Sequence, residues 1–168
     1  MNLLEHLTPE ALALDQVARG VAACPAFQTA CQVASAEEAT PFVHREAWFV
    51  PGEDVTQPFA AIWPPAGGGV QIEKLSDGTW MPSGSMSLQI GQPILDPDNL
   101  EQSGNDFRNL HGQIIEWLTQ EPNKEGGYIL TPRQIVGQAF TTDAELEALE
   151  GKVPFWSVLY SIDWGPFG

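Results

Sequence analysis

The most apolar run of the chain extends from Phe155 to Gly165 and alternates with a period of two. One face of such a strand would carry the large side chains of Trp156, Val158, Tyr160, Ile162 and Trp164. The other face would carry Leu159 and the polar side chains of Ser157, Ser161 and Asp163. This pattern predicts a strand that buries one face. Because an exposed strand of this kind promotes aggregation, we expect it to be paired inside a sheet.

Two helices are predicted near the start of the chain. The segment Thr8–Glu10 combines an N-cap threonine, a proline for the first helical position and an acid for the first turn. Apolar residues then recur at helical spacing, at Leu14, Val17, Ala18 and Val21. Pro25 is expected to end this helix and to open a second, short one anchored by Phe27. Residues 34–40 are expected to form a loop or a single turn.

A longer helix is predicted after a polar connection that spans residues 93–105. Its apolar stripe consists of Phe107, Leu110, Ile114, Trp117 and Leu118. Pro122 is expected to stop this helix. Further along, Thr142 and Glu145 have the spacing of a capping box, which predicts either a short acidic helix or an acidic loop tip.

The other periodic segments predict strands, at residues 42–49, 58–63, 70–75, 79–90 and 128–140. Gly67–Gly69 is expected to form a flexible turn, and Ser76–Gly78 a hairpin turn. Pro82–Gly84 is expected to break or bulge its strand, and Pro132 suggests an edge strand or a bulge. Residues 58–90 would then form an antiparallel meander.

Helices and strands are segregated along the chain, which predicts a single α+β domain over residues 1–168. We expect a mostly antiparallel sheet of about five to six strands with helices packed on one face. In this arrangement Val158 and Ile162 should face the helical stripe that includes Phe107 and Ile114.

The chain has 168 residues, with 7 Lys and Arg against 22 Asp and Glu, and a net charge of −15. This charge disfavours tight binding of nucleic acid, although it permits DNA to pass nearby without adhering. The simpler interpretation is that the charge keeps the protein soluble. No signal peptide is expected in Met1–His6, and no apolar run approaches the ~20 residues of a membrane span. We therefore expect synthesis in a cytoplasm and no membrane partner.

The sequence contains little that indicates chemistry. His6, His44 and His111 lie apart from one another at spacings that do not suit a metal site, and His44 and His111 are expected at solvated or boundary positions. Cys24 and Cys31 would lie about two helical turns apart, too far for a disulfide, and are expected to be buried thiols. No nucleophile turn or phosphate loop is present. We expect no catalytic, cofactor or metal site.

Acidic residues and tryptophans are the remaining candidates for function. The acids Asp143, Glu145, Glu147 and Glu150 are compatible with a weak cation site but are more simply a solvated tip. Trp117 and Trp156 belong to periodic faces and are expected in the core. Trp48, Trp63, Trp80 and Trp164 lie near predicted strand ends, where one or two could mark contact surfaces, although core filling is the better expectation for any single one.

Several segments together resemble a bacteriophage family. They are Ala22–Gln28, which closes the N-terminal helix pair, Trp80–Ser85 leading into the strand at 86–90, Asp106–Leu110 on the long helix, and Ile162–Gly165 at the end. The order of elements over nearly the whole chain is similar to that of the small tail terminator (tail-completion) proteins of long-tailed bacteriophages and prophages.

The resemblance implies a structural α+β subunit that forms a homo-oligomeric ring, a hexamer in this family. Such a ring caps the tail tube protein, ends its polymerisation and presents a surface to the head-closure or connector protein, while DNA passes through the lumen. It implies a location in the virion tail or neck and no cofactor. An acidic lumen would let DNA slide without adhering. Candidate interface or lumen residues are Glu53, Asp54, Trp80, Asp143, Glu145, Glu147 and Glu150.

Other functions remain open from the sequence. A head-closure (stopper) protein or another neck protein of the same virion is the nearest alternative. A small-molecule enzyme of unrecognised family and a monomeric binding module that uses exposed tryptophans are alternatives of other classes. The loops at 51–57, 64–69 and 141–152 are the segments expected to contact neighbours in a ring, and the last is expected to project.

Overall fold

Two consecutive helices and two short helical turns open the fold. The computed structural model describes residues 8–65, 69–124, 127–148, 150 and 153–166. The first helices are α1 (Pro9–Ala23) and α2 (Pro25–Cys31), and shorter turns follow at α3 (Ala36–Ala39) and η2 (Thr40–Phe42). The Thr8 hydroxyl accepts a hydrogen bond of 3.2 Å from the Ala11 N–H. The predicted cap and the predicted boundary at Pro25 are therefore both confirmed.

Six strands form one mostly antiparallel sheet, which confirms the α+β class. They are β1 (Val43–His44), β2 (Phe59–Trp63), β3 (Gln71–Lys74), β4 (Trp80–Pro93), β5 (Ile129–Phe140) and β6 (Phe155–Gly165). The main order is β1-β2-β4-β6-β5, in which only β1 and β2 are parallel. The predicted final strand, β6, lies between β4 and β5 and is thus paired on both sides.

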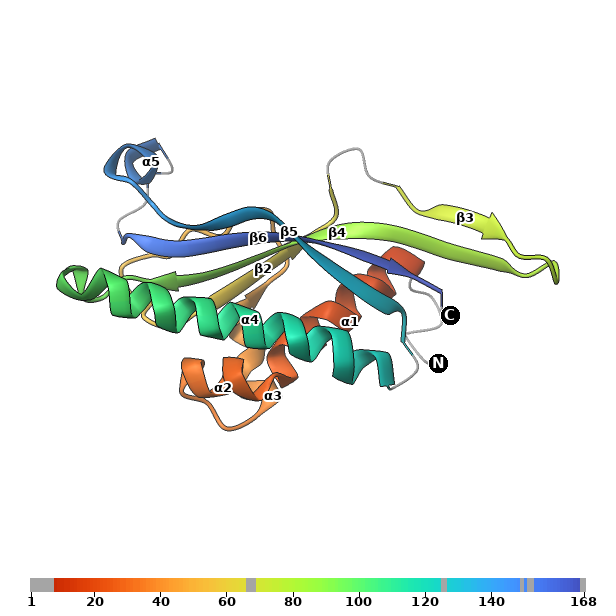
Figure 1. Ribbon diagram of the computed structural model, residues 1–168, viewed down its shortest axis with the longest axis horizontal. Helices are drawn as coiled ribbons and strands as arrows, with labels where there is room; N and C mark the ends of the chain where they lie inside the picture. The colour runs from red at the N-terminus through yellow and green to blue at the C-terminus, as the bar shows by residue number, and fades with distance from the viewer. Residues whose placement is uncertain (1–7, 66–68, 125–126, 149, 151–152, 167–168) are drawn as a thin grey trace.

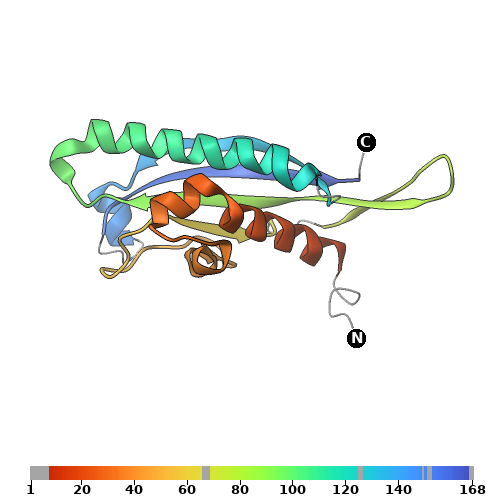
Figure 2. The same ribbon diagram turned by 90° about the horizontal axis from the view of Figure 1, so that it is seen from below.

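Three further helical segments complete the fold. The turn η3 (Pro97–Asn99) leads into α4 (Leu100–Lys124), and α5 (Asp143–Ala148) lies between β5 and β6. Figures 1 and 2 show α1 and α4 lying against the same face of the sheet. Phe107, Ile114, Val158 and Ile162 are fully buried in one apolar core there. The predicted contact between the helical stripe and the final strand is confirmed.

The opposite face of the sheet carries a smaller aromatic cluster of Phe49, Phe59 and Phe155. Their ring centroids lie 4.8 Å apart for Phe49 and Phe59, and 5.8 Å apart for Phe59 and Phe155. The buried Gln89 amide binds both backbone groups of Phe49, at 3.0 and 3.3 Å, and so fixes the loop that covers the cluster. Part of the second face is therefore closed by a loop rather than by a helix.

Several predicted boundaries are wrong. The strand expected at 42–49 is reduced to β1, since only Val43 and His44 pair with β2, and Trp48 further along has a left-handed φ of 56° that does not suit a strand. The helix α4 continues past Pro122, which falls in the last turn, where few further backbone hydrogen bonds can be lost. The predicted break at Pro82–Gly84 is also wrong. Pro82 is paired on one side only, with Ile72, so its missing N–H need not remove a ladder bond.

The predicted meander is wrong in its pairing. The strands β2 and β3 pair with different parts of β4: β2 with residues 87–91, and β3 with residues 80–83. The hairpin turn at Ser76–Gly78 is confirmed, with Gly78 at a φ of 89° that suits glycine. The prediction for Gly67–Gly69 falls mainly on residues 66–68, outside the described residues.

Candidate functional site

The sheet register brings three connecting segments to one end of the molecule. Phe59, at the start of β2, pairs with Gly91 of β4, which pairs with Ser157 of β6. Ser157 in turn pairs with Ala139 of β5. The loop before β2, the segment after β4 and the excursion between β5 and β6 therefore lie at the same end. We call this region, defined by residues 51–57, 94–101, 141–148 and 150, the acidic end.

The acidic end carries exposed carboxylates without any neighbouring cation in the same segments. Its acids are Glu53, Asp54, Asp96, Asp98, Glu101, Asp143, Glu145, Glu147 and Glu150, all exposed. No Lys or Arg occurs in these segments. The structure thus brings together the six acids that the sequence singled out. It adds Asp96, Asp98 and Glu101, which were missed because only the register of β4 shows where they lie.

The excursion at 141–154 is anchored at its base. The Thr141 N–H donates to the Phe155 carbonyl at 3.0 Å, and the Phe155 N–H donates to the Thr141 hydroxyl at 3.0 Å. Reciprocal bonds between Thr142 and Glu145, at 3.2 and 2.8 Å, confirm the capping box and the short helix α5. The acids of α5 therefore stand on a defined support, and Figure 1 shows α5 projecting from one end of the molecule.

A hairpin projects at the other end. Strand β6 begins to pair with β4 only at Gly84, so residues 80–83 of β4 have β3 as their partner strand. Figures 1 and 2 show this two-stranded ribbon extending beyond the rest of the molecule. At its tip the Thr79 N–H donates to the Asp77 carboxylate at 2.8 Å, and this bond lowers the pKa of Asp77. We call residues 71–83 the arm.

One face of the arm is apolar and carries a cation. Directly paired residues share a face, so Ile72 and Pro82 lie beside Lys74 and Trp80. Ile72 and Trp80 are each 61% exposed, and the Lys74 ammonium lies 5.6 Å from the Trp80 ring. We call these four residues the apolar arm face. Trp80, a candidate interface or lumen residue, is thus exposed. It lies at the opposite end of the molecule from the six acids that were predicted for the same role.

A second exposed apolar surface lies on β5, the edge strand of the sheet. Its pairing with β6 shifts register between Gln134 and Val136 and again before Ala139. The exposed fractions of Ile135, Val136 and Phe140 there are 49%, 51% and 46%. Val136 pairs with Leu159 on the face away from α4, whereas Phe140 pairs with Trp156, whose Nε1 bonds to Ser103 of α4, so Phe140 lies on the helix-covered face. We call Ile135 and Val136, which lie at the first register shift, the bulged patch. The sequence predicted an edge or bulge only at Pro132, although the adjacent apolar pair at 135–136, which interrupts the alternation, was a usable signal.

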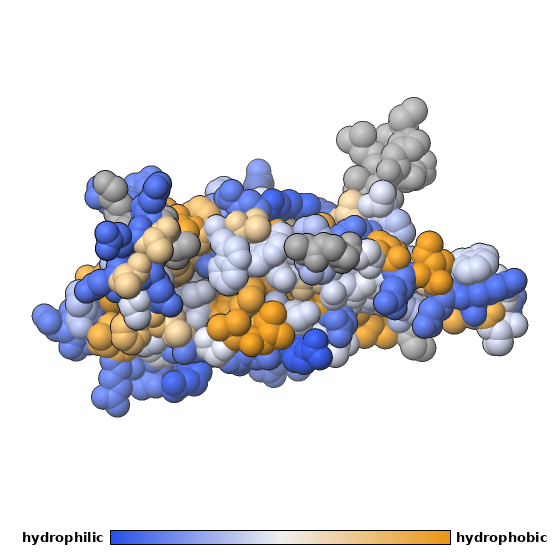
Figure 3. Space-filling model, turned by 90° about the horizontal axis from the view of Figure 1, so that it is seen from above, coloured by the Kyte–Doolittle hydropathy of each residue, from blue (hydrophilic) through white to orange (hydrophobic). Residues whose placement is uncertain are grey.

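Figure 3 shows the open face of the sheet from above. Hydrophobic surface gathers near the middle of this face and again along the arm at the right, with hydrophilic surface between. On this face, apolar side chains are therefore exposed in separate places, including the left end, rather than in one contiguous patch.

His111 is buried, which corrects the prediction of a surface or boundary position. Its Nδ1 lies 2.7 Å from the Tyr160 hydroxyl and its Nε2 lies 3.0 Å from Gln138 Oε1. Gln138 Nε2 donates to the Gly104 carbonyl at 2.8 Å, so Oε1 must accept from a protonated Nε2. Nδ1 then accepts from Tyr160. Burial lowers the pKa of His111, and Arg108 adds to this effect.

His44 and the cysteines also occupy structural positions. The His44 ring stacks on Phe49 with centroids 3.6 Å apart, so the predicted solvated strand face is wrong, and burial lowers the pKa of His44. Cys24 and Cys31 are buried free thiols, as predicted. Burial raises the pKa of Cys31 to about 12, which leaves it an unreactive thiol at neutral pH.

Three tryptophans have clear roles inside the fold. Trp117 and Trp156 pack half-buried against the core and donate from Nε1 to the Gly20 carbonyl and the Ser103 hydroxyl, each at 2.9 Å. Trp164, predicted near a strand end, is 2% exposed and belongs to the core. Trp48 and Trp80 are the tryptophans with exposed rings among the described residues.

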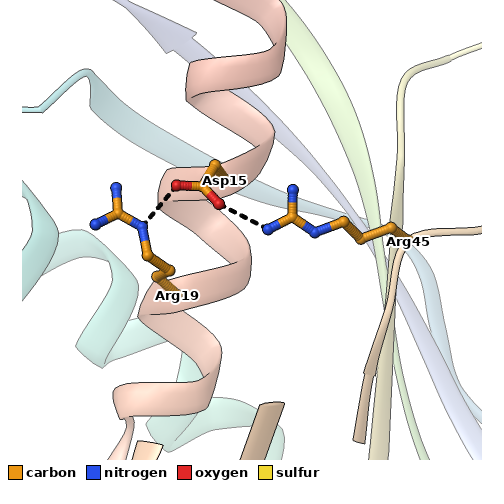
Figure 4. Close-up of polar contacts among 3 residues, drawn as sticks. All are labelled: Asp15, Arg19 and Arg45. Atoms are coloured by element: carbon orange, nitrogen blue, oxygen red, sulfur yellow. Dashed lines mark hydrogen bonds and ion pairs between the residues drawn. The ribbon is translucent and has the colours of Figure 1, made fainter. Parts of the chain in front are cut away.

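A small charged cluster ties the segment after β1 to α1 (Figure 4). The two oxygens of Asp15 bind Arg19 Nε and Arg45 Nη2, each at 2.7 Å. Both arginines are more than half exposed, so each pair contributes at most about 1 kcal/mol. The cluster accounts for two of the few cations of this acidic chain.

No group of three or more His, Cys, Asp or Glu side chains within the described residues is arranged to hold a metal ion. None of the helices traced in that part of the chain has both the length and the hydropathy to cross a bilayer. A shallow polar hollow at the start of α4 is lined by Asp98, Asn99, Glu101, Gln102 and Asn105.

Comparison of the chain with protein-family models and with curated proteins gave no match.

Proposed function

We propose that this chain is a structural virion protein that assembles into a ring and terminates the tail tube of a long-tailed bacteriophage. In this role the ring ends polymerisation of the tube and joins the tail to the connector on the head side. The observation that carries the proposal is the presence of two unlike apolar surfaces on one chain, the apolar arm face and the bulged patch. Unlike surfaces favour heterologous contacts, which give closed rings when the rotation between copies closes.

The family resemblance of the sequence supports the same proposal. The tail terminator resemblance implied an α+β subunit, and the chain has an α+β fold with α1 and α4 on one face of the sheet. This agreement concerns the fold class, which many unrelated functions share, so the proposal rests on the surfaces rather than on the fold.

The acidic end suits a position beside passing DNA. Its carboxylates carry no cation in the same segments, so they would repel phosphate and leave DNA free to slide. In a ring they would line the bore or its rim. A ring whose bore is lined by Lys and Arg, with the acids outside, would contradict this part of the proposal.

Native mass spectrometry of the purified chain tests the proposal. A closed ring of about six copies, and no continuous ladder of larger species, is the expected result. A chain that stays monomeric at high concentration would contradict a ring-forming role and would favour a binding module or an enzyme instead.

A further inference from the structure

The arm exposes apolar side chains although it is a hairpin of only two strands. Beyond Gly84 it consists of two strands only, and every residue from 71 to 80 is exposed. An isolated two-stranded ribbon is marginally stable in water. With Ile72 and Trp80 on the same face, the arm has the properties of a segment that is completed by a contact with another surface.

The edge strand β5 offers two different halves to such a contact. From Ile129 to Gln134 it pairs regularly with β6, but Pro132 and Arg133 protect this half, because a proline and a charge are common guards against strand addition. From Ile135 onward the register shifts interrupt the ladder, and the bulged patch is exposed. Docking of side chains on the bulged patch is therefore favoured over addition of a strand to the edge.

The arm cannot reach the bulged patch of its own chain. Figure 1 shows the arm at one end of the longest axis and α5, which follows β5 directly, at the other. The register agrees, since the arm extends beyond Gly84 and Trp164 whereas Val136 pairs with Leu159. A contact between these two surfaces therefore needs a second copy of the chain.

The charges beside the two surfaces indicate how one copy is oriented on the other. Lys74 lies on the apolar arm face and forms no ion pair with any described residue. Asp143 begins α5 three residues after Phe140, and Glu147 follows one turn later on the same side of the helix. The arm thus carries a cation, and the excursion that follows the bulged strand carries acids, which is the kind of complementarity that orients an interface between two copies.

We propose that the arm of one copy docks by its apolar face on the bulged patch of the next copy, with Lys74 beside the acids of α5. The contact is directional, because each copy gives its arm to one neighbour and its bulged patch to another. This inference rests on the proposed ring, for which it names the two contacting surfaces.

Cross-linking between two single-cysteine variants of the full chain tests the contact. Ile72→Cys and Val136→Cys both lie at exposed positions, and the native Cys24 and Cys31 are buried, so they do not compete for reagent. A mixture of the two variants treated with a short bis-maleimide should give a cross-linked pair of chains. Ile72→Cys mixed with Gln113→Cys, on the exposed side of α4, is the matched control and should give little product.

Affinity measurements on two further variants test the side chains. Trp80→Ser should weaken association about thirtyfold, as loss of an aromatic anchor does. Lys74→Glu should weaken it about threefold, and reversal of the acids by Asp143→Lys with Glu147→Lys should restore it. Because these residues are exposed, the thermal stability of each isolated chain should stay unchanged.

The outcomes separate this inference from the proposed function. A ring that forms without cross-linking of residues 72 and 136, and that tolerates Trp80→Ser, overturns the docking contact but not the ring. Cross-linking within a closed dimer supports the pairing of the two surfaces but overturns both its directional arrangement and the ring. A chain that remains monomeric in every assay overturns both.

Discussion

At the scale of single residues, the aromatic cluster on the loop-covered face depends on a glycine. A Cβ atom at Gly91 would lie within 2.2 Å of the Phe59 ring, which is fully buried between Phe49 and Phe155. The neighbouring rings of Phe49 and Phe155 restrict its movement. The absence of a side chain at Gly91 therefore holds the loop and the sheet at their observed separation.

We predict that Gly91→Ala destabilises the fold by about 1–3 kcal/mol, the usual cost of overpacking a core. Gly112→Ala is a control for which the opposite change in the stability of the fold is expected. It lies exposed in α4 with nothing near its Cβ position, and should stabilise the fold by about 0.5–1 kcal/mol. Urea unfolding of both variants measures the difference. Equal stability of Gly91→Ala and the parent chain would show that the aromatic cluster is loosely packed.

His111 makes the stability of the fold dependent on pH. Its folded pKa is lowered by burial, so below pH ~6.5 the unfolded chain binds a proton that the folded chain does not. Stability contributed by neutral His111 is therefore present above this range and falls as the pH drops toward the lowered pKa. His44, also lowered by burial, acts in the same direction.

We predict that the parent chain loses more stability between pH 7.5 and 5.5 than His111→Asn does. Asparagine keeps a polar group between Tyr160 and Gln138 but does not titrate in this range. Unfolding free energies of the two chains at both pH values give the comparison. A parallel loss in both would mean that His111 titrates normally in the folded state.

At the scale of elements, local patterns in the sequence predicted most of the secondary structure. The cap at Thr8, the stripe of α4, the capping box of α5 and the alternation of β6 all depend on neighbouring residues, and all are confirmed. The errors concern long-range pairing. Nothing local shows that β2 and β3 share β4, and this sharing creates the arm.

The same limit applies to the candidate site. The acids of α5 were evident from their sequence cluster, whereas Asp96 and Asp98 join them only through the register of β4. His111 was placed at the surface because its partner Tyr160 lies 49 residues away in the chain. Local periodicity identifies elements, but the composition of a surface depends on contacts between distant elements.

The excursion between β5 and β6 is predicted to be dispensable for folding and necessary for assembly. Its base is tied by Thr141 and Phe155, and α5 buries no residue that the core needs. Replacement of residues 143–150 by a short Gly-Ser linker should leave the thermal transition nearly unchanged. The same variant should fail to form rings in mass photometry. Normal ring assembly by this variant would contradict a contact role for the excursion.

At the scale of the whole molecule, charge and apolar surface are distributed unevenly along the longest axis. The acidic end collects carboxylates from three segments, and the arm projects at the opposite end with exposed Ile72 and Trp80 (Figures 1 and 3). A chain with a net charge of −15 repels its own copies unless specific contacts offset the repulsion. Added salt should therefore favour assembly. At 0.1 M it screens the repulsion between charges that lie more than ~10 Å apart.

The final strand β6 is the structural centre of this arrangement. It is paired on both sides, and its large side chains are packed under α4. The surfaces proposed for assembly lie on the elements around it, on the arm of β4 and on β5 with the excursion that follows. The surfaces proposed for assembly thus lie at the periphery of the sheet, whereas its central strand is paired and packed inside the fold.

Electron microscopy of the purified full chain tests the central proposal most directly. Closed rings of uniform diameter, with a central opening and about six subunits, are the predicted result. Monomers, closed dimers or open filaments at the same concentration would contradict the account of this chain as a ring-forming tail terminator.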